Sequence, residues 1–146
     1  MEKKPPVKTQ EEEIRELIYK LQLFQAESES LQQQASLIEL SLNEIESTIQ
    51  TLNSMDGVKP GQEVIVPIGA GAHIYANIAR LDKIVVNIGA GISIEKNIEE
   101  TKKFLEKRRD ELRRGYEQVI SNLNAVTAEI QKLQQEAQKY RGNKNV

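Results

Sequence analysis

The sequence predicts an α+β fold in which two long helices form an antiparallel coiled coil joined by two central β-hairpins. Two hydrophobic patterns lead to this prediction: a seven-residue repeat near both ends of the 146-residue chain, and a two-residue repeat in its middle. Glycine marks the boundaries, because six of the eight glycines fall within residues 57–95. We therefore expect a single domain over 1–146, with helices over 9–56 and 96–141 and hairpins over 57–95.

The first helical segment carries an unbroken heptad. Apolar residues recur in alternating steps of three and four, a pattern typical of coiled coils. Thr9 and Glu12 have the spacing of a capping box at the start, and Gly57 supplies a left-handed stop. The seam residues are Ile14, Leu17, Leu21, Phe24, Ser28, Leu31, Ala35, Ile38, Leu42, Ile45, Ile49 and Leu52.

The second helical segment repeats the heptad with a more polar beginning. Its first two a positions are Lys102 and Arg109, and charged residues there specify register at some cost in stability. Both segments are about 70 Å long at 1.5 Å per residue. Because the lengths match, we favour pairing of the two helices with each other over pairing of each with other chains. The d positions are Ile98, Leu105, Leu112, Val119, Val126, Leu133 and Tyr140.

The middle segment alternates apolar and polar residues. Apolar side chains occupy the even positions from 64 to 94, except at Arg80 and Asp82, where we expect a turn. The pattern predicts strands over 62–68, 72–79, 83–88 and 91–95. Residues 66–74 repeat as 86–94 with six of nine positions identical. Each pair of strands is therefore expected to form a β-hairpin that turns at Gly-Ala-Gly.

The apolar face of these strands has no cover within the chain. Short hairpins are marginally stable in water, and their edges expose unpaired backbone groups. We therefore expect the face to be buried against other subunits, which makes the protein an oligomer. The predicted assembly residues are Val64, Val66, Ile68, Ile74, Ile78, Ile84, Val86, Ile88, Ile92 and Ile94.

Apolar residues off the seam occur near the free end of the coil, where both chain ends would lie. Tyr19 and Leu23 occupy outward heptad positions and Ile18 flanks the seam, while Leu37 and Leu40 have the same character in mid-helix. Such residues indicate contact with other proteins, and a slightly wider core is the alternative. A fraying end would expose seam residues too. The predicted tip residues are Ile14, Leu17, Ile18, Tyr19, Leu21, Leu23, Leu133, Ala137 and Tyr140.

Composition excludes most site chemistries. The chain has no cysteine and one histidine, which rules out disulfides, thiolate metal sites and clusters of two imidazoles. The net charge of -2 opposes binding nucleic acid through bulk charge, although residues 102–114 hold seven basic and three acidic residues. Neither Gly-Ala-Gly turn has the third glycine and following helix of a dinucleotide site. We expect no enzyme activity, cofactor, metal or nucleic-acid partner.

The sequence also bears on location. No apolar stretch approaches the roughly 20 residues that a membrane span needs. The N-terminal residues lack the apolar run of a secretory signal. We therefore expect a soluble, cytoplasmic protein without membrane contact, with flexible ends over 1–8 and 142–146.

The sequence resembles the prefoldin family, specifically its archaeal α-type subunits. The resemblance rests on residues 66–71 (VPIGAG) and 82–91 (DKIVVNIGAG), followed by Ile94-Glu95-Lys96 before the second helix. It covers nearly the whole chain, and the two hairpins are similar to the α class, since the β class has one. It departs from the family pattern at Ile92-Ser93, where an aromatic pair is common, and at 73–77, which lacks a common Pro-Gly.

The resemblance implies a hexamer of two α-type and four β-type subunits whose hairpins build a β-barrel body. It also implies an ATP-independent chaperone that holds non-native proteins at the coiled-coil tips and delivers them to a group II chaperonin. Neither the stoichiometry nor the chaperonin follows from the residue pattern alone. A structural coiled-coil tether or spacer of another complex is the alternative, and an enzyme or an RNA-gripping arm is a more distant one.

Overall fold

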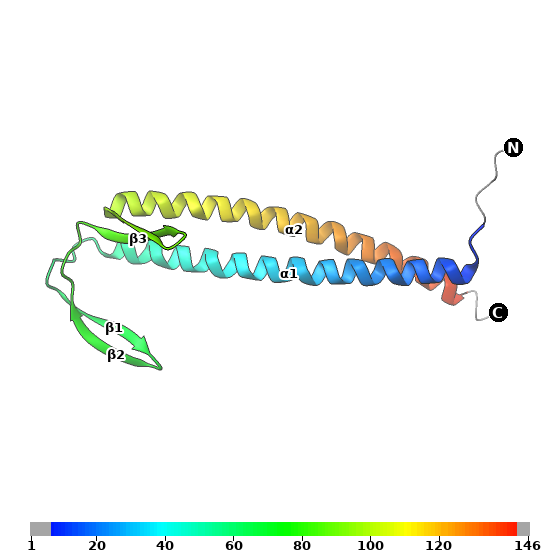
Figure 1. Cartoon of the computed structure of the whole chain (residues 1–146), viewed down its shortest axis with the longest axis horizontal. Coiled ribbons are helices and arrows are strands. Elements are labelled where there is room, and N and C mark those ends of the chain that lie inside the picture. Colours follow the sequence, from blue (N-terminus) through cyan, green and yellow to red (C-terminus); the bar gives the residue numbers. More distant parts are fainter. Residues whose placement is uncertain (1–6, 143–146) are drawn as a thin grey trace. The chain divides into compact units, whose positions relative to one another are not determined.

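The structure, a computed structural model, contains two long helices and four short strands (Figure 1). It describes residues 7–142, so most of both predicted flexible ends lies outside the described residues. The order of helix, two hairpins and helix confirms the predicted fold class. The elements are α1 (Gln10–Ser54), β1 (Glu63–Gly69), β2 (Ala72–Asn77), β3 (Ile84–Gly89), β4 (Ile92–Lys96) and α2 (Ile98–Gly142).

The chain divides into two compact units. The terminal unit holds Met1–Glu39 and Arg114–Val146, and the hairpin unit holds Leu40–Arg113. Each unit therefore contains part of both helices, and the hairpin unit also contains all four strands. The single domain expected over 1–146 stays a prediction.

The first helix begins where the sequence places a cap. The Glu12 amide donates to Thr9 Oγ1 at 3.3 Å, and the Thr9 amide donates to the Glu12 carboxylate at 3.4 Å. This reciprocal pair confirms the predicted capping box. After the helix ends at Ser54, Gly57 has a φ of +89°, the left-handed conformation that favours glycine. The helix stops two residues before the predicted 56 because residues 55–57 form a turn.

The second helix begins at Ile98, two residues later than predicted, because Asn97 caps it. The Asn97 Oδ1 atom accepts a hydrogen bond from the Glu100 amide at 2.8 Å. The Asn97 carbonyl also accepts hydrogen bonds from the amide and hydroxyl of Thr101, whose side chain is buried. Lys96 consequently belongs to β4 rather than to the helix.

In the terminal unit the two helices run antiparallel around the predicted seam. Near one end, the Tyr140 hydroxyl of α2 donates to Glu13 of α1 at 2.6 Å. Further along, the Tyr116 hydroxyl donates to Glu39 at 2.7 Å. The buried seam residues of this unit are Leu17, Leu31, Ala35, Val126 and Leu133.

In the hairpin unit the helices are again antiparallel, and the seam includes a charged layer. Arg109 Nη1 of α2 lies 3.4 Å from Glu46 Oε1 of α1, and Arg113 reaches the same oxygen at 3.3 Å. Every predicted seam residue of both helices is buried or half-buried, which confirms the heptad register. The buried seam residues of this unit are Ile45, Ile49 and Leu52.

The four strands form two separate antiparallel hairpins, β1–β2 and β3–β4. The turn residues Ala70-Gly71 and Ala90-Gly91 all have positive φ, as a type I′ turn requires. The register shifts immediately before each turn, between Pro67 and Gly69 in β1 and at the equivalent place in β3. Both hairpins and both Gly-Ala-Gly turns are thus confirmed. The second strand begins at the predicted residue 72, and the other strand ends differ from the predicted ones by one or two residues.

Burial along α1 gives a direct test of the register. We expect Leu52→Ala to destabilise the folded chain by about 2–5 kcal/mol, because this side chain is only 4% exposed and its loss leaves a cavity. The matched control is Leu40→Ala in the same unit, where a leucine that is 66% exposed should change stability by less than about 0.5 kcal/mol. Urea unfolding of both variants measures the difference, and equal destabilisation would show that the register is wrong.

Candidate functional site

The predicted assembly residues follow one face of each hairpin. Val66 pairs with Ile74 across the first hairpin, and Val86 pairs with Ile94 across the second. Directly opposite residues in an antiparallel pair lie on the same face, so these pairs form continuous apolar strips. Val66, Ile68, Ile74, Ile88 and Ile92 are exposed, and Val64, Ile78, Ile84, Val86 and Ile94 are half-buried.

The first hairpin is also apolar on its opposite face, which the sequence analysis did not single out. Ile65 pairs with Tyr75 on that face, and their side chains are 60% and 74% exposed. A hollow of about 320 Å³ is lined by Ile65, His73, Ile74 and Tyr75. The signal was present in the sequence, since Ile65 occupies an odd position in the alternating pattern.

The second hairpin differs on its opposite face. Val85 is 70% exposed there, but its neighbours Lys83 and Glu95 form an ion pair at 3.4 Å.

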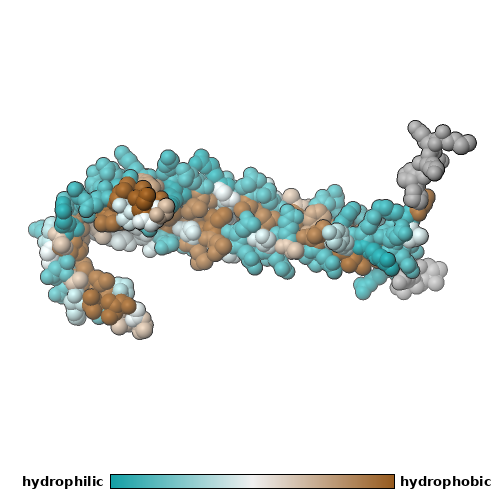
Figure 2. All heavy atoms as spheres, viewed as in Figure 1, coloured by the Kyte–Doolittle hydropathy of each residue, from teal (hydrophilic) through white to brown (hydrophobic). Residues whose placement is uncertain are grey.

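Figure 2 shows hydrophobic residues gathered on both hairpins. Apolar surface left in water costs about 25 cal/mol per Å² relative to buried surface. Both hairpins therefore offer surfaces that a partner would stabilise by covering them.

The predicted tip residues fall into two groups by exposure. Ile18, Tyr19 and Leu23 are between 49% and 62% exposed and are available as the chain stands. The remaining six lie in the seam, so they reach a ligand only where the end of the coil opens. Of these, Leu17 and Leu133 are buried, and Ile14, Leu21, Ala137 and Tyr140 are half-buried.

A groove between the helices adjoins the exposed tip residues. Its volume is about 510 Å³, and it lies within the terminal unit. Three apolar and five charged side chains line it, which suits an amphipathic segment more than a small polar ligand. The residues lining it are Lys20, Leu23, Phe24, Glu27, Glu129, Lys132, Leu133 and Glu136.

A hydrogen bond closes the last turns of the coil. The Tyr140 hydroxyl donates to Glu13, and this bond raises the pKa of Tyr140 above its ordinary value of about 10. The same arrangement at Tyr116, which donates to Glu39, raises the pKa of that phenol. Both pKa shifts have the same main cause, the hydrogen bond that the protonated phenol donates to a carboxylate, and desolvation and the negative charge nearby raise each pKa further.

The described residues hold little that could perform chemistry. Within residues 7–142, no three His, Cys, Asp or Glu side chains cluster as ligands for a metal ion. None of the helices in that part of the chain combines the length and apolar character needed to cross a membrane. The features that remain are apolar surfaces on the hairpins and along α1, together with a two-helix coil. This combination defines a class of protein, a two-helix coiled coil with uncovered apolar hairpins.

Comparison with known proteins specifies the family. A family model described as "Prefoldin subunit" matches residues 24–142. The prefoldin subunit alpha of Methanosarcina acetivorans is 36% identical over 132 residues, which cover 88% of this chain and 92% of the relative. That of Thermofilum pendens is 35% identical over 107 residues, covering 73% of this chain and 83% of the relative. The chain belongs to the prefoldin family, whose members are chaperone subunits rather than enzymes.

A solved structure supports the fold. The filamentous PFD from Methanocaldococcus jannaschii superposes with a TM-score of 0.70 at 24% identity, covering 81% of this chain and 98% of that one. Prefoldin subunits assemble into oligomers with other prefoldin subunits. The uncovered hairpin faces of this chain are consistent with that behaviour, although no closed barrel forms among the four strands alone.

The phenol at the end of the coil provides a test by titration. We expect Glu13→Gln to lower the titration midpoint of Tyr140, because the carboxylate is the main cause of its raised pKa. A raised acid pKa means that the folded chain holds the proton more tightly. The bond therefore contributes its full stability below the unfolded pKa of about 10 and loses it as pH rises through the folded pKa.

NMR of the tyrosine ring carbons across the alkaline range measures this midpoint. Tyr116 serves as the internal control, because its partner Glu39 is unchanged. A Tyr140 midpoint that is identical in the parent chain and the Glu13→Gln variant would contradict the assignment.

Proposed function

We propose that this chain is the α-type subunit of an ATP-independent molecular chaperone. Two copies would join four β-type subunits in a hexamer, hold non-native proteins at the ends of the coils, and deliver them to a group II chaperonin. The observation that carries the proposal is apolar surface exposed in two separate places, on the hairpins and near the start of α1, in a prefoldin-family chain. The same proposal places the chain in the cytoplasm, with the non-native proteins that it would hold.

The hairpins supply the proposed assembly surface. Each is only two-stranded, so every strand has one edge whose backbone groups lack a partner in the hairpin. Strands of neighbouring subunits would pair with these edges and cover the apolar strips at the same time. Closure of a sheet into a barrel removes the open edges altogether, which favours a barrel-shaped body over a stack of hairpins.

The exposed tip residues supply the proposed client surface. This surface consists of the exposed aliphatic and aromatic side chains of Ile18, Tyr19 and Leu23. It has no arrangement of polar atoms that would select one particular ligand. Burial of apolar surface is non-directional and scales with area, so it suits clients that share no sequence. Holding a client in this way consumes no nucleotide.

The first test concerns assembly. We expect the double variant Ile74→Asp, Val86→Asp to abolish the hexamer formed with a β-type partner, because each buried unpaired carboxylate costs several kcal/mol. Asn87→Asp is the matched control, since it adds a negative charge on the face opposite Val86. Sedimentation velocity of each mixture measures the assembly, and an intact hexamer in the double variant would refute hairpin-mediated assembly.

The second test concerns client holding and starts from the assembled complex. Ile18→Ser, Tyr19→Ser and Leu23→Ser together should leave the hexamer intact and weaken its protection of an aggregating client. Leu40→Ser removes a side chain of similar exposure in the other unit and should preserve protection. Light scattering of the client measures the effect.

The outcomes separate the proposed chaperone from its alternative. Unchanged protection in the triple variant would place the client surface elsewhere. Binding of one fixed ligand, with no protection of unrelated denatured proteins by the parent complex, would instead identify a coiled-coil tether. The double variant of the first test is expected not to assemble. Client holding is therefore measured on the parent complex and its tip variants, not on the double variant.

A further inference from the structure

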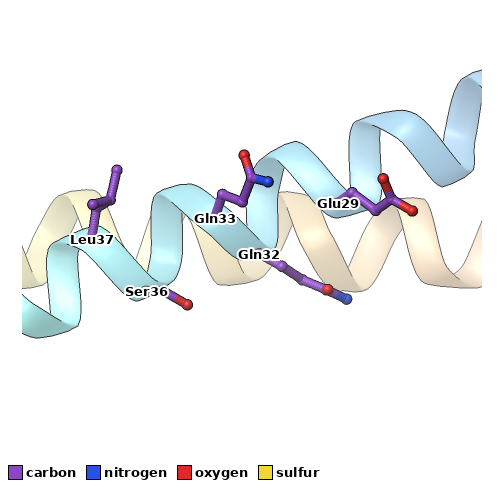
Figure 3. A pocket seen from close by; sticks show the side chains of 5 residues that line it. All are labelled: Glu29, Gln32, Gln33, Ser36 and Leu37. Atoms are coloured by element: carbon purple, nitrogen blue, oxygen red, sulfur yellow. The ribbon is translucent and has the colours of Figure 1, made fainter.

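The aromatic side chain of Phe104 lies outside the coil seam, yet it is partly covered. It occupies a c position of α2, one residue before the seam residue Leu105, and c positions point away from the partner helix. Figure 3 shows the usual result in Leu37, a c-position residue of α1, which projects beside a shallow groove of about 640 Å³ and is 65% exposed. Phe104 is half-buried instead, so groups other than the seam cover its ring.

Two cationic side chains lie over the ring of Phe104. The Lys96 ammonium nitrogen is 5.3 Å from the ring centroid, and the Arg108 guanidinium carbon is at the same distance. Both lie within the roughly 6 Å over which the negative face of an aromatic ring attracts a cation. The ring therefore makes two cation–π contacts.

Lys96 has an electrostatic reason to lie over this ring. It precedes the first residue of α2 by two positions, and the positive end of a helix dipole disfavours a cation. The adjacent carboxylate of Glu95 is paired with Lys83 at 3.4 Å. The ring of Phe104 supplies partial negative charge to the Lys96 ammonium group and offsets the helix dipole.

The two cations come from different elements of the hairpin unit. Arg108 lies one turn after Phe104 on α2, a spacing at which side chains of any helix meet. Lys96 is the last residue of β4 and pairs with Ile84 across the second hairpin. Directly opposite residues lie on one face, so Lys96 shares the face that carries the predicted assembly residues. Its contact with Phe104 therefore fastens the base of that face to α2.

The first hairpin carries alanine at the equivalent position. Val64 pairs with Ala76 in the first hairpin, as Ile84 pairs with Lys96 in the second, and both positions differ by the 20-residue offset of the internal repeat. A methyl side chain cannot bring a cation to a ring. The contact with α2 therefore distinguishes the second hairpin from the first.

The exposure of the two apolar strips follows the same distinction. Val86 and Ile94 of the second hairpin are half-buried, whereas their counterparts Val66 and Ile74 are 38% and 49% exposed. The two hairpins have equivalent pairing and equivalent turns, so hairpin pairing alone does not explain the difference. A second hairpin whose apolar face is held toward α2 does explain it.

We propose that Phe104 is a positioning residue for assembly, which fixes the angle at which the second hairpin leaves α2. This inference rests on the proposed assembly through the hairpins. A hairpin that swings freely must lose that freedom when a partner strand pairs with its edge, and the lost entropy weakens binding. The contact between Lys96 and Phe104 removes part of that freedom before the β-type subunit arrives.

A double-mutant cycle tests the contact. Phe104→Leu removes the ring but keeps an apolar side chain, and Lys96→Gln removes the charge but keeps most of the stem. We expect each variant to raise by about threefold the concentration of β-type subunit that gives half-maximal hexamer, the size expected for one exposed cation–π contact. The two together should also give about threefold rather than about ninefold, because the same contact is lost only once. Sedimentation velocity measures these concentrations.

Two control variants accompany the cycle. Lys83→Gln removes a hairpin charge that pairs with Glu95 rather than with the ring, and it should leave half-maximal assembly unchanged. Phe104→Tyr keeps an aromatic ring and should assemble as the parent chain does. Unchanged assembly in both single variants of the cycle, or a ninefold effect of the pair, would overturn the proposal. The parent hexamer is the reference throughout, so this failure would leave hairpin-mediated assembly to its own test.

Hydrogen exchange of the full chain without its partner separates positioning from direct contact with the β-type subunit. In Phe104→Leu we expect the amides of β3 and β4 to exchange about threefold faster than in the parent chain, because a hairpin fastened to a helix opens less often. The amides of β1 and β2 are the internal control, since Ala76 stands there in place of Lys96. Equal behaviour of the two hairpins, whether unchanged or faster, would overturn the positioning role of Phe104.

Discussion

Burial of the heptad seam between α1 and α2 is the interaction on which the rest of this chain depends. The seam contains all eight buried apolar residues of the described chain, and the hairpins contain none of them. Long helices in proteins owe most of their stability to packing of an apolar face. Because the seam holds the helices antiparallel in the hairpin unit, the end of α1 and the start of α2 lie close enough for two hairpins to connect them.

A charged layer refines this interaction. Arg109 occupies a seam position, is 23% exposed, and shares Glu46 with Arg113. Within the described residues, the buried Arg109 Nε has no hydrogen-bond partner. A partly desolvated cation costs stability, but it restricts the helices to registers that bring a carboxylate within reach. The arrangement therefore exchanges some stability for a defined alignment of the helices.

The apolar surfaces that lie outside the α1–α2 seam are the ones that a partner can cover. The hairpin faces and the exposed tip residues are two apolar surfaces with different shapes. A sheet face with open edges suits another strand, and a loose cluster suits an unstructured polypeptide. The same non-directional force operates in both, and the backbone geometry beneath each surface selects the kind of partner.

Periodicity was enough to predict the helices, the hairpins, the turns and the heptad register, because seam and strand positions follow directly from 3.6-residue and two-residue spacings. Asn97 as the cap of α2 was missed, although Asn97 and Glu100 have the same spacing as the Thr9 and Glu12 cap of α1. The heptad also placed Leu17 in the seam and Tyr19 on the outward side, and packing against α2 indeed buries Leu17 and leaves Tyr19 62% exposed. Only the tertiary structure decided which side chains meet across the coil. The shared carboxylate of Glu46 likewise depends on two helices meeting, which no local pattern encodes.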